Sequence, residues 1–140
     1  MGRKEAVRQR ASDRCEYCRL PQGAFRRRFH IEHIIARQHG GTTSLDNLCI
    51  RLLDMQPEKG TQPSGIDPET GLVTALFHPR EHLWLEHFSA RVATHIPRGI
   101  EIRGLTPVGR TTVRVLALNE DMRQTVRYEL WLEGLYIVGI

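Results

Sequence analysis

The sequence predicts an α+β fold, and three patterns support this prediction. Residues 28–35 ("RFHIEHII") are rich in β-branched and aromatic side chains, which indicates a strand. Residues 90–105 alternate around Pro97–Gly99 as the two arms of a hairpin do. Thr106 followed by Pro107 is typical of a helix start, and a last helix is expected from about Glu120 to Glu133.

The other elements follow from local composition. Residues 3–13 are mostly charged, and Ala6, Val7 and Ala11 form a thin apolar stripe among them. This pattern predicts a short basic helix. "HGG" at 39–41 provides the positive-φ positions of a loop. "SLDNLCI" at 44–50 predicts a return strand, and "RLLDMQPEKG" at 51–60 predicts a helix that Pro57 interrupts.

The second half predicts an extension that packs on the first. "TQPSGIDPETG" at 61–71 is rich in turn residues, and the segment after it supplies the expected core side chains Leu72, Leu76, Phe77, Leu83, Trp84 and Phe88. Length favours one domain over 1–140, in which 1–60 hold the site and 61–140 form the C-terminal extension.

Composition is that of a soluble globular protein, with 40% hydrophobic and 26% charged residues. No apolar run approaches the twenty or so residues of a membrane span, and the first residues lack a signal peptide's apolar segment. The sequence therefore predicts a cytoplasmic protein without a membrane partner. Oligomeric state is not readable.

Positive charge is concentrated near the N-terminus. The net charge is +4, and all basic residues except Lys4 and Lys59 are arginine. A guanidinium donates two hydrogen bonds to one oxyanion, so an arginine-rich surface suits phosphate, although a solubilising charge excess is the plain alternative. Position favours phosphate, since nine arginines fall within the first 40 residues: Arg3, Arg8, Arg10, Arg14, Arg19, Arg26, Arg27, Arg28 and Arg37.

Two short motifs have chemical meaning. Cys15 and Cys18 in "CEYC" have the spacing of half a zinc site, which redox pairs and chance pairs share. In "HIEH", strand alternation puts His30 and Glu32 on one face and His33 on the other. Glu32 can bind a hard divalent ion and His33 can take a proton from water. Alone, however, the motif fits ordinary surface polar residues better than a site.

Together these motifs resemble the HNH nuclease family, whose fold is a ββα-metal core. "CEYC", eleven further residues, "HIEHIIARQHGG", "LDNL" and a final "KG" follow the family's order. "GIDPETGLVTALFHPREHLWLEHF" and "IRGLTPVGRTTVRVLALN" look like the tail of a bacterial subgroup of this family. The resemblance thus covers nearly the whole chain.

The resemblance implies an endonuclease that hydrolyses phosphodiester bonds in nucleic acid, with DNA favoured over RNA. Glu32 would bind a catalytic Mg²⁺ or Mn²⁺, with His30 as a further candidate ligand, and His33 would be the general base. Asn47 would hold that base in orientation. Cys15 and Cys18 would bind half of a structural zinc, while Arg26, Arg27, Arg28, Arg37 and Lys59 would grip phosphates.

The pattern breaks after Asn47. The family's second cysteine pair should fall on Leu52 and Met55, and its second catalytic ligand on Gln56. Leucine has no donor, a thioether binds zinc poorly, and Gln offers a neutral carbonyl. Cys49 would leave zinc three-coordinate at best. The zinc site is therefore predicted to be incomplete.

A shift of reading frame accounts for the break. When Cys49–Gly60 is back-translated and the first base is dropped, positions 49–59 read Ala-Phe-Ala-Cys-Leu-Thr-Cys-Asn-Arg-Arg-Lys. Met55-Gln56 forces the bases ATG CA, so a shifted cysteine at position 55 does not depend on codon choice. We therefore hypothesise two compensating single-base changes around 49–59; true divergence to an inactive protein is the alternative.

The leading hypothesis is thus an HNH-type endonuclease impaired in this stretch. A non-catalytic nucleic-acid-binding protein that retains the basic surface is the main alternative. A redox protein that uses "CEYC" is disfavoured, because the chain lacks a βαβ pattern.

Overall fold

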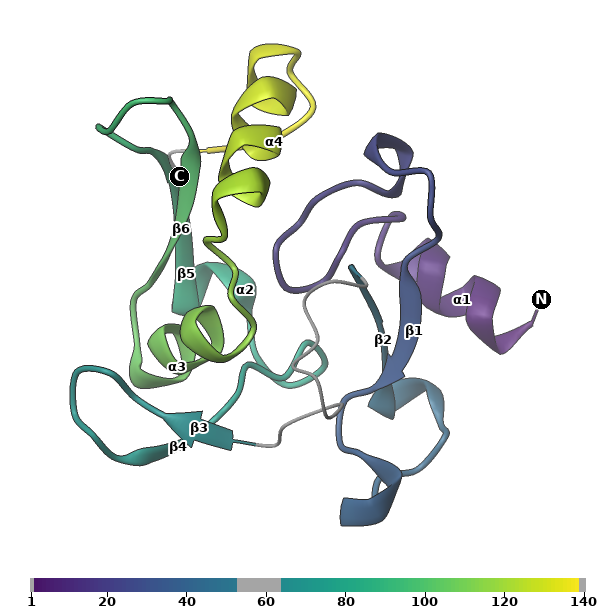
Figure 1. The fold of residues 1–140 in the computed structure, drawn as a ribbon. Helices are drawn as coiled ribbons and strands as arrows, with labels where there is room; N and C mark the ends of the chain where they lie inside the picture. The colour runs from purple at the N-terminus through teal and green to yellow at the C-terminus, as the bar shows by residue number, and fades with distance from the viewer. Residues whose placement is uncertain (1, 53–63, 139–140) are drawn as a thin grey trace. The chain divides into compact units, whose positions relative to one another are not determined.

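The structure, a computed structural model, describes residues 2–52 and 64–138 (Figure 1). The chain divides into two compact units: Met1–Pro63 with His78–His82, and Ser64–Phe77 with Leu83–Ile140. Helices and small antiparallel strand pairs are mixed, as an α+β fold requires. That 1–140 form a single domain, with 61–140 packed on 1–60, stays a prediction. Within the described residues, no helix is long and apolar enough to cross a membrane.

The first unit is built on one hairpin and one helix. β1 (His30–His33) and β2 (Leu48–Arg51) pair antiparallel, with Glu32 opposite Cys49 and His33 opposite Leu48. α1 (Arg3–Arg10) packs on β2 and buries Val7 (Figure 1). The helix that would complete a ββα core falls on 53–60, and the predicted broken helix there lies largely outside the described residues.

β1 is shorter than the strand predicted at 28–35, and hydrogen bonding explains why. The N–H of Phe29 donates to Gln22 Oε1 at 2.6 Å, so the chain before His30 is tied to the preceding loop. After His33, the N–H of Ile34 donates to the carbonyl of Asn47 at 2.8 Å. The N–H of Ile35 then donates to Asn47 Oδ1 at 2.9 Å, so a side-chain acceptor takes the place of a strand partner at both ends.

The second unit follows the predicted hairpin and helices closely. β5 (Phe88–Val92) pairs with β6 (Ile100–Gly104), and α3 (Pro107–Val115) and α4 (Asp121–Leu132) pack against β6 (Figure 1). Thr106 caps α3 by accepting the N–H of Gly109 at 3.0 Å, as predicted. The sequence did not predict the hairpin of β3 (Ser64–Ile66) and β4 (Val73–Ala75), nor the short α2 (Trp84–His87).

The predicted core of this unit is correct for its aromatic residues and wrong for two leucines. Phe77, Trp84 and Phe88 are buried, and the Phe88 ring lies 5.1 Å from each of the other two rings. Leu72 and Leu83 are 66% and 68% exposed. Leu72 follows the β3–β4 turn and Leu83 is the N-cap of α2, so both lie just outside a regular element.

Candidate functional site

The hairpin of the first unit presents the predicted carboxylate and histidines. His30 Nδ1 lies 3.3 Å from Glu32 Oε1, which confirms that these two side chains share a face of β1. The His30 side chain is exposed, and Glu32 is partly covered. The face therefore offers one carboxylate and one imidazole to an approaching ligand.

His33 points to the opposite face. Its Nε2 lies 3.1 Å from the hydroxyl oxygen of Thr43, a group that can donate or accept. The two side chains line a hollow of about 560 Å³ together with Ile31, Leu48 and the start of α1. A proton acceptor is thus held beside open space, as a general base requires.

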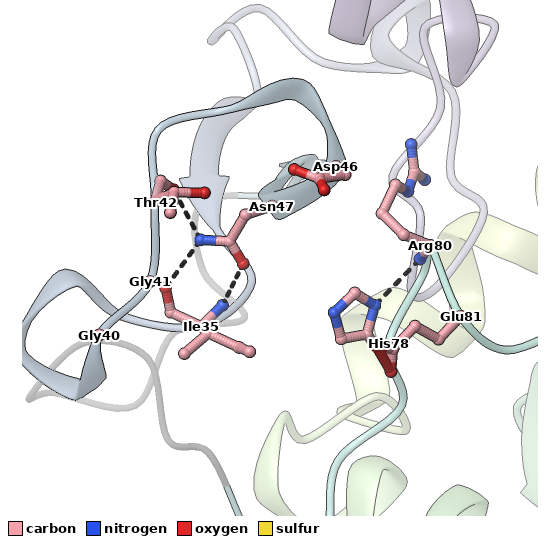
Figure 2. Close-up of a pocket in the computed structure, with 9 residues that line it drawn as sticks. All are labelled: Ile35, Gly40, Gly41, Thr42, Asp46, Asn47, His78, Arg80 and Glu81. Carbon is pink, nitrogen blue, oxygen red and sulfur yellow. Dashed lines mark hydrogen bonds between the residues drawn. The ribbon is translucent and has the colours of Figure 1, made fainter.

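Asn47 fixes the loop that carries Thr43 (Figure 2). Its side chain is buried, accepts the N–H of Ile35 at 2.9 Å, and donates to the carbonyls of Ile35 and Thr42 at 3.0 and 2.7 Å. A Cβ on Gly41 would lie 1.8 Å from the Ile35 carbonyl oxygen, so only glycine fits that position. These side-chain bonds go to Ile35 and Thr42, so Asn47 is linked to His33 through the backbone of the loop.

The two knuckle cysteines are buried and hydrogen-bonded. The N–H of Cys18 donates to Cys15 Sγ at 3.5 Å. Burial raises the pKa of the Cys15 thiol, whereas hydrogen bonds from the side chain and backbone of Cys18 lower it. Backbone N–H groups of Leu52 and Tyr17 also donate to this sulfur, and its pKa settles at about 6. The geometry favours a thiolate at Cys15, the form that binds zinc.

The end of β2 fits this knuckle poorly. Leu52 is buried, and its backbone lies against Cys15, so a leucine stands where the family resemblance expects a third cysteine. Arg51 is 1% exposed, and its Nε and Nη2 have no hydrogen-bond partner among residues 2–52 and 64–138. Its guanidinium carbon lies 5.5 Å from the centre of the Tyr17 ring, which offsets only part of the desolvation cost.

Cys49 does not compensate for the missing zinc ligand. It is buried opposite Glu32, and its thiol donates to the Tyr17 hydroxyl at 3.9 Å. Burial is the main cause that raises the pKa of this thiol to about 12. A cysteine binds zinc as its thiolate, so Cys49 is a poor third donor.

Neither metal site is complete in the part of the chain that the structure describes. No group of three or more His, Cys, Asp or Glu side chains there is arranged to hold an ion. Glu32 with His30 and Cys15 with Cys18 are pairs of donors, which fit parts of a catalytic and a zinc site respectively. Met55 and Gln56, at the other expected ligand positions, lie outside the described residues.

The predicted phosphate-binding arginines differ in their availability. Arg26, Arg27, Arg28 and Arg37 are exposed, while Lys59 lies outside the described residues. Three other arginines of the first unit serve the fold. Arg10 donates to the carbonyls of Leu45 and Leu48, Arg14 donates to that of Arg19, and Arg80 pairs with Glu16.

Sequence reasoning missed a segment that joins the site region from far along the chain. His78, Arg80 and Glu81 line a hollow of about 400 Å³ with Asp46 and the loop that Asn47 fixes (Figure 2). His78 Nδ1 accepts the N–H of Arg80 at 3.2 Å, which leaves Nε2 as the donor of a neutral imidazole. The charged run "HPREH" was the available signal, although its partners are more than 30 positions away.

The HNH endonuclease family model matches residues 15–50. The matched segment contains Glu32, His33 and Asn47, which confirms the resemblance to this family and indicates a nuclease-type function in general. The match ends at Ile50, directly before the poorly fitting Arg51 and Leu52. No curated protein and no solved structure matches the chain.

Proposed function

We propose that this chain is an HNH-type endonuclease that hydrolyses phosphodiester bonds in nucleic acid, with DNA as the preferred substrate, and that the stretch 49–59 impairs it. The observation that supports this most is the arrangement of the hairpin. It holds Glu32 and His33 on opposite faces of one strand, inside the segment that matches the family.

The proposed chemistry begins at His33. Its imidazole takes a proton from a water molecule, and the water oxygen bonds to phosphorus. The bond from phosphorus to the leaving oxygen breaks, and that oxygen keeps the electron pair and takes a proton from solvent. In the family's chemistry a Mg²⁺ or Mn²⁺ ion supplies positive charge for the phosphate oxygens. Glu32 is the donor present for such an ion, but the described residues do not complete its site.

The impairment is proposed from the conflict at Arg51 and Leu52. The shifted reading frame would put alanine at 51, which removes a buried guanidinium with two unpaired nitrogens. It would put cysteine at 52, next to the Cys15 sulfur. The first change would remove a buried cation that is partly unpaired, and the second would supply a third thiol beside the Cys15–Cys18 pair. This coincidence favours a frame change over gradual divergence.

A non-catalytic nucleic-acid-binding protein is the second candidate. It is favoured by the same incomplete metal sites, combined with exposed arginines at 26, 27 and 28. The two candidates predict the same binding and differ only in cleavage.

Plasmid nicking separates the two candidates. With Mg²⁺ or Mn²⁺, the enzyme should convert supercoiled plasmid to the nicked form, weakly in the chain as written, and His33→Ala should abolish this while DNA binding persists. His39→Ala, which removes an exposed histidine nearby, is the matched control and should cut at the parental rate. Absence of nicking in both the chain and its repaired form, described below, would leave the binding protein as the better account.

A further inference from the structure

Two hollows of the first unit border α1. One is the hollow of His33, which Arg3, Lys4 and Glu5 also line. The other measures about 650 Å³ and is lined by α1 residues including Lys4, Glu5 and Arg8, together with Gln9, Asp13 and Arg28. Lys4 and Glu5 border both hollows, so basic side chains line α1 from the hollow of His33 to that of Arg28.

Arg8 is incompletely satisfied at the far end of this surface. Its Nη2 donates to the carbonyl of Phe29 at 2.9 Å, while its buried Nη1 has no partner among the described residues. Burial lowers the pKa of Arg8, the nearby charge of Arg28 lowers it further, and Asp13 raises it. A buried donor beside a second cation is costly unless an anion approaches both.

We propose that the sugar-phosphate backbone of the substrate lies along α1, with Lys4, Arg8 and Arg28 binding the phosphates that flank the one presented to His33. This inference rests on the proposed function and assigns the strand's path. An eight-residue helix is about 12 Å long. At about 3.4 Å of duplex axis per phosphate of one strand, it spans roughly three to four phosphates.

The acidic residues on this surface favour a polymer over a single ion. Glu5 lines both hollows and Asp13 lines the larger one, so each hollow has only a small excess of positive charge. A lone phosphate would gain little there. A chain of phosphates contacts several donors at once and gains from each, as nonspecific nucleic-acid binding does.

Some basic residues of the first unit are hydrogen-bonded within the fold, which narrows the choice of positions to test. Arg10 lies on the same helix but is bonded to two backbone carbonyls. Lys4 and Arg28 are exposed and can be changed without removing a bond that holds the fold. They are therefore the positions to test.

The test is binding of a short fluorescein-labelled DNA duplex by anisotropy, with salt varied between about 50 and 200 mM. Lys4→Gln and Arg28→Gln should each weaken binding several-fold at low salt, and each should reduce the slope of log K against log salt by about one. Arg114→Gln, which removes an exposed charge from the second unit, is the matched control and should leave affinity and slope nearly unchanged. Glu5→Gln should strengthen binding.

The outcomes separate this inference from the proposed function. If the parent binds DNA and the Lys4 and Arg28 variants match the Arg114 variant, the path along α1 is wrong while the nuclease proposal stands. Loss of binding in Arg26→Gln or Arg37→Gln alone would place the strand elsewhere. A parent that does not bind DNA at low salt contradicts both proposals. Inorganic phosphate is a further competitor to test at matched ionic strength. If it displaces the labelled duplex as well as unlabelled DNA does, the site binds a single anion and the polymer assignment is wrong.

Discussion

Each unit of the protein buries one arginine almost completely, and the two arginines differ in their hydrogen bonding. Arg127 in α4 is 0% exposed, and its Nε donates to the carbonyl of Ile100 at 2.9 Å. Its Nη2 donates to the Leu118 carbonyl at 2.9 Å and to Asn119 Oδ1 at 3.2 Å. Arg51 in β2 is 1% exposed, and the same two nitrogens have no hydrogen-bond partner among residues 2–52 and 64–138.

The difference shows where sequence and structure agree. In the second unit, a buried cation joins β6, the α3–α4 connection and α4 through three acceptors, so charge and fold support one another. In the first unit, a buried cation lies over an aromatic ring, and its Nε and Nη2 have no hydrogen-bond partner among the described residues. Natural sequences are locally consistent with their folds, so the two buried and unpaired nitrogens of Arg51 mark the end of β2 as a place where the sequence and the described fold agree poorly.

Repair of the stretch should have the largest effect. We expect replacement of Cys49–Glu58 by Ala-Phe-Ala-Cys-Leu-Thr-Cys-Asn-Arg-Arg to give one zinc per molecule, a higher Tm and ion-dependent nicking, because four cysteines can then surround the metal. The chain as written should bind zinc weakly and cut poorly. Zinc is measured by atomic emission after gel filtration, and nicking on plasmid.

The control for repair is the same replacement combined with Cys15→Ser, which should lose the zinc and the gain in Tm. Equal zinc content and equal nicking in the written and repaired chains would show that the frame hypothesis is wrong.

Arg127→Met should be the most destabilising single change. It leaves two carbonyls and an amide oxygen without their charged donor, which costs about 3 kcal/mol. Urea unfolding followed by tryptophan fluorescence measures this, since Trp84 and Trp131 both lie in the second unit. Arg103→Met, which removes an exposed arginine from β6, should change stability by less than about 0.5 kcal/mol. A similar cost for the two variants would undermine the comparison.

Asp67 should make the second unit sensitive to acid. Arg110 donates to both carboxylate oxygens at 3.0 and 2.9 Å, and this holds the pKa of Asp67 well below its usual range. A folded-state pKa below that of the unfolded chain, about 3.9, means that the stabilisation is complete above that pH and is lost as pH falls. Asp67→Asn should lower the Tm at pH 7 and flatten its decline below about pH 5, whereas Glu129→Gln should preserve the parental profile.

Arg51→Met should have the smallest effect, and its sign matters more than its size. Removal of an unpaired buried cation is expected to leave stability unchanged or to raise it by about 1 kcal/mol, because no hydrogen bond from Nε or Nη2 is lost. Calorimetric unfolding measures it. A loss comparable to that of Arg127→Met would mean that Arg51 has a partner beyond the described residues.

The sequence predicted those features that depend on interactions between residues close in the chain. Thr106-Pro107 specified a helix start, and alternation around Pro97–Gly99 specified the β5–β6 hairpin. The site residues on β1 were readable for the same reason, since alternation decides which side chains share a face. The approach of His78 to the Asn47 loop was not readable, because it depends on tertiary contacts across 31 positions of sequence. The burial of Arg51 was also missed, since arginine is rarely a core residue.

The bond from the Ile35 amide to Asn47 Oδ1 has a practical consequence for spectroscopy. Ile35 is itself exposed, so its amide proton would exchange rapidly with solvent if that bond were absent. The exchange rate of this one amide in D₂O therefore measures how often the Asn47 loop opens, and no substrate is needed. The same amide resonance can report on loop opening in every variant, including those that never cut DNA.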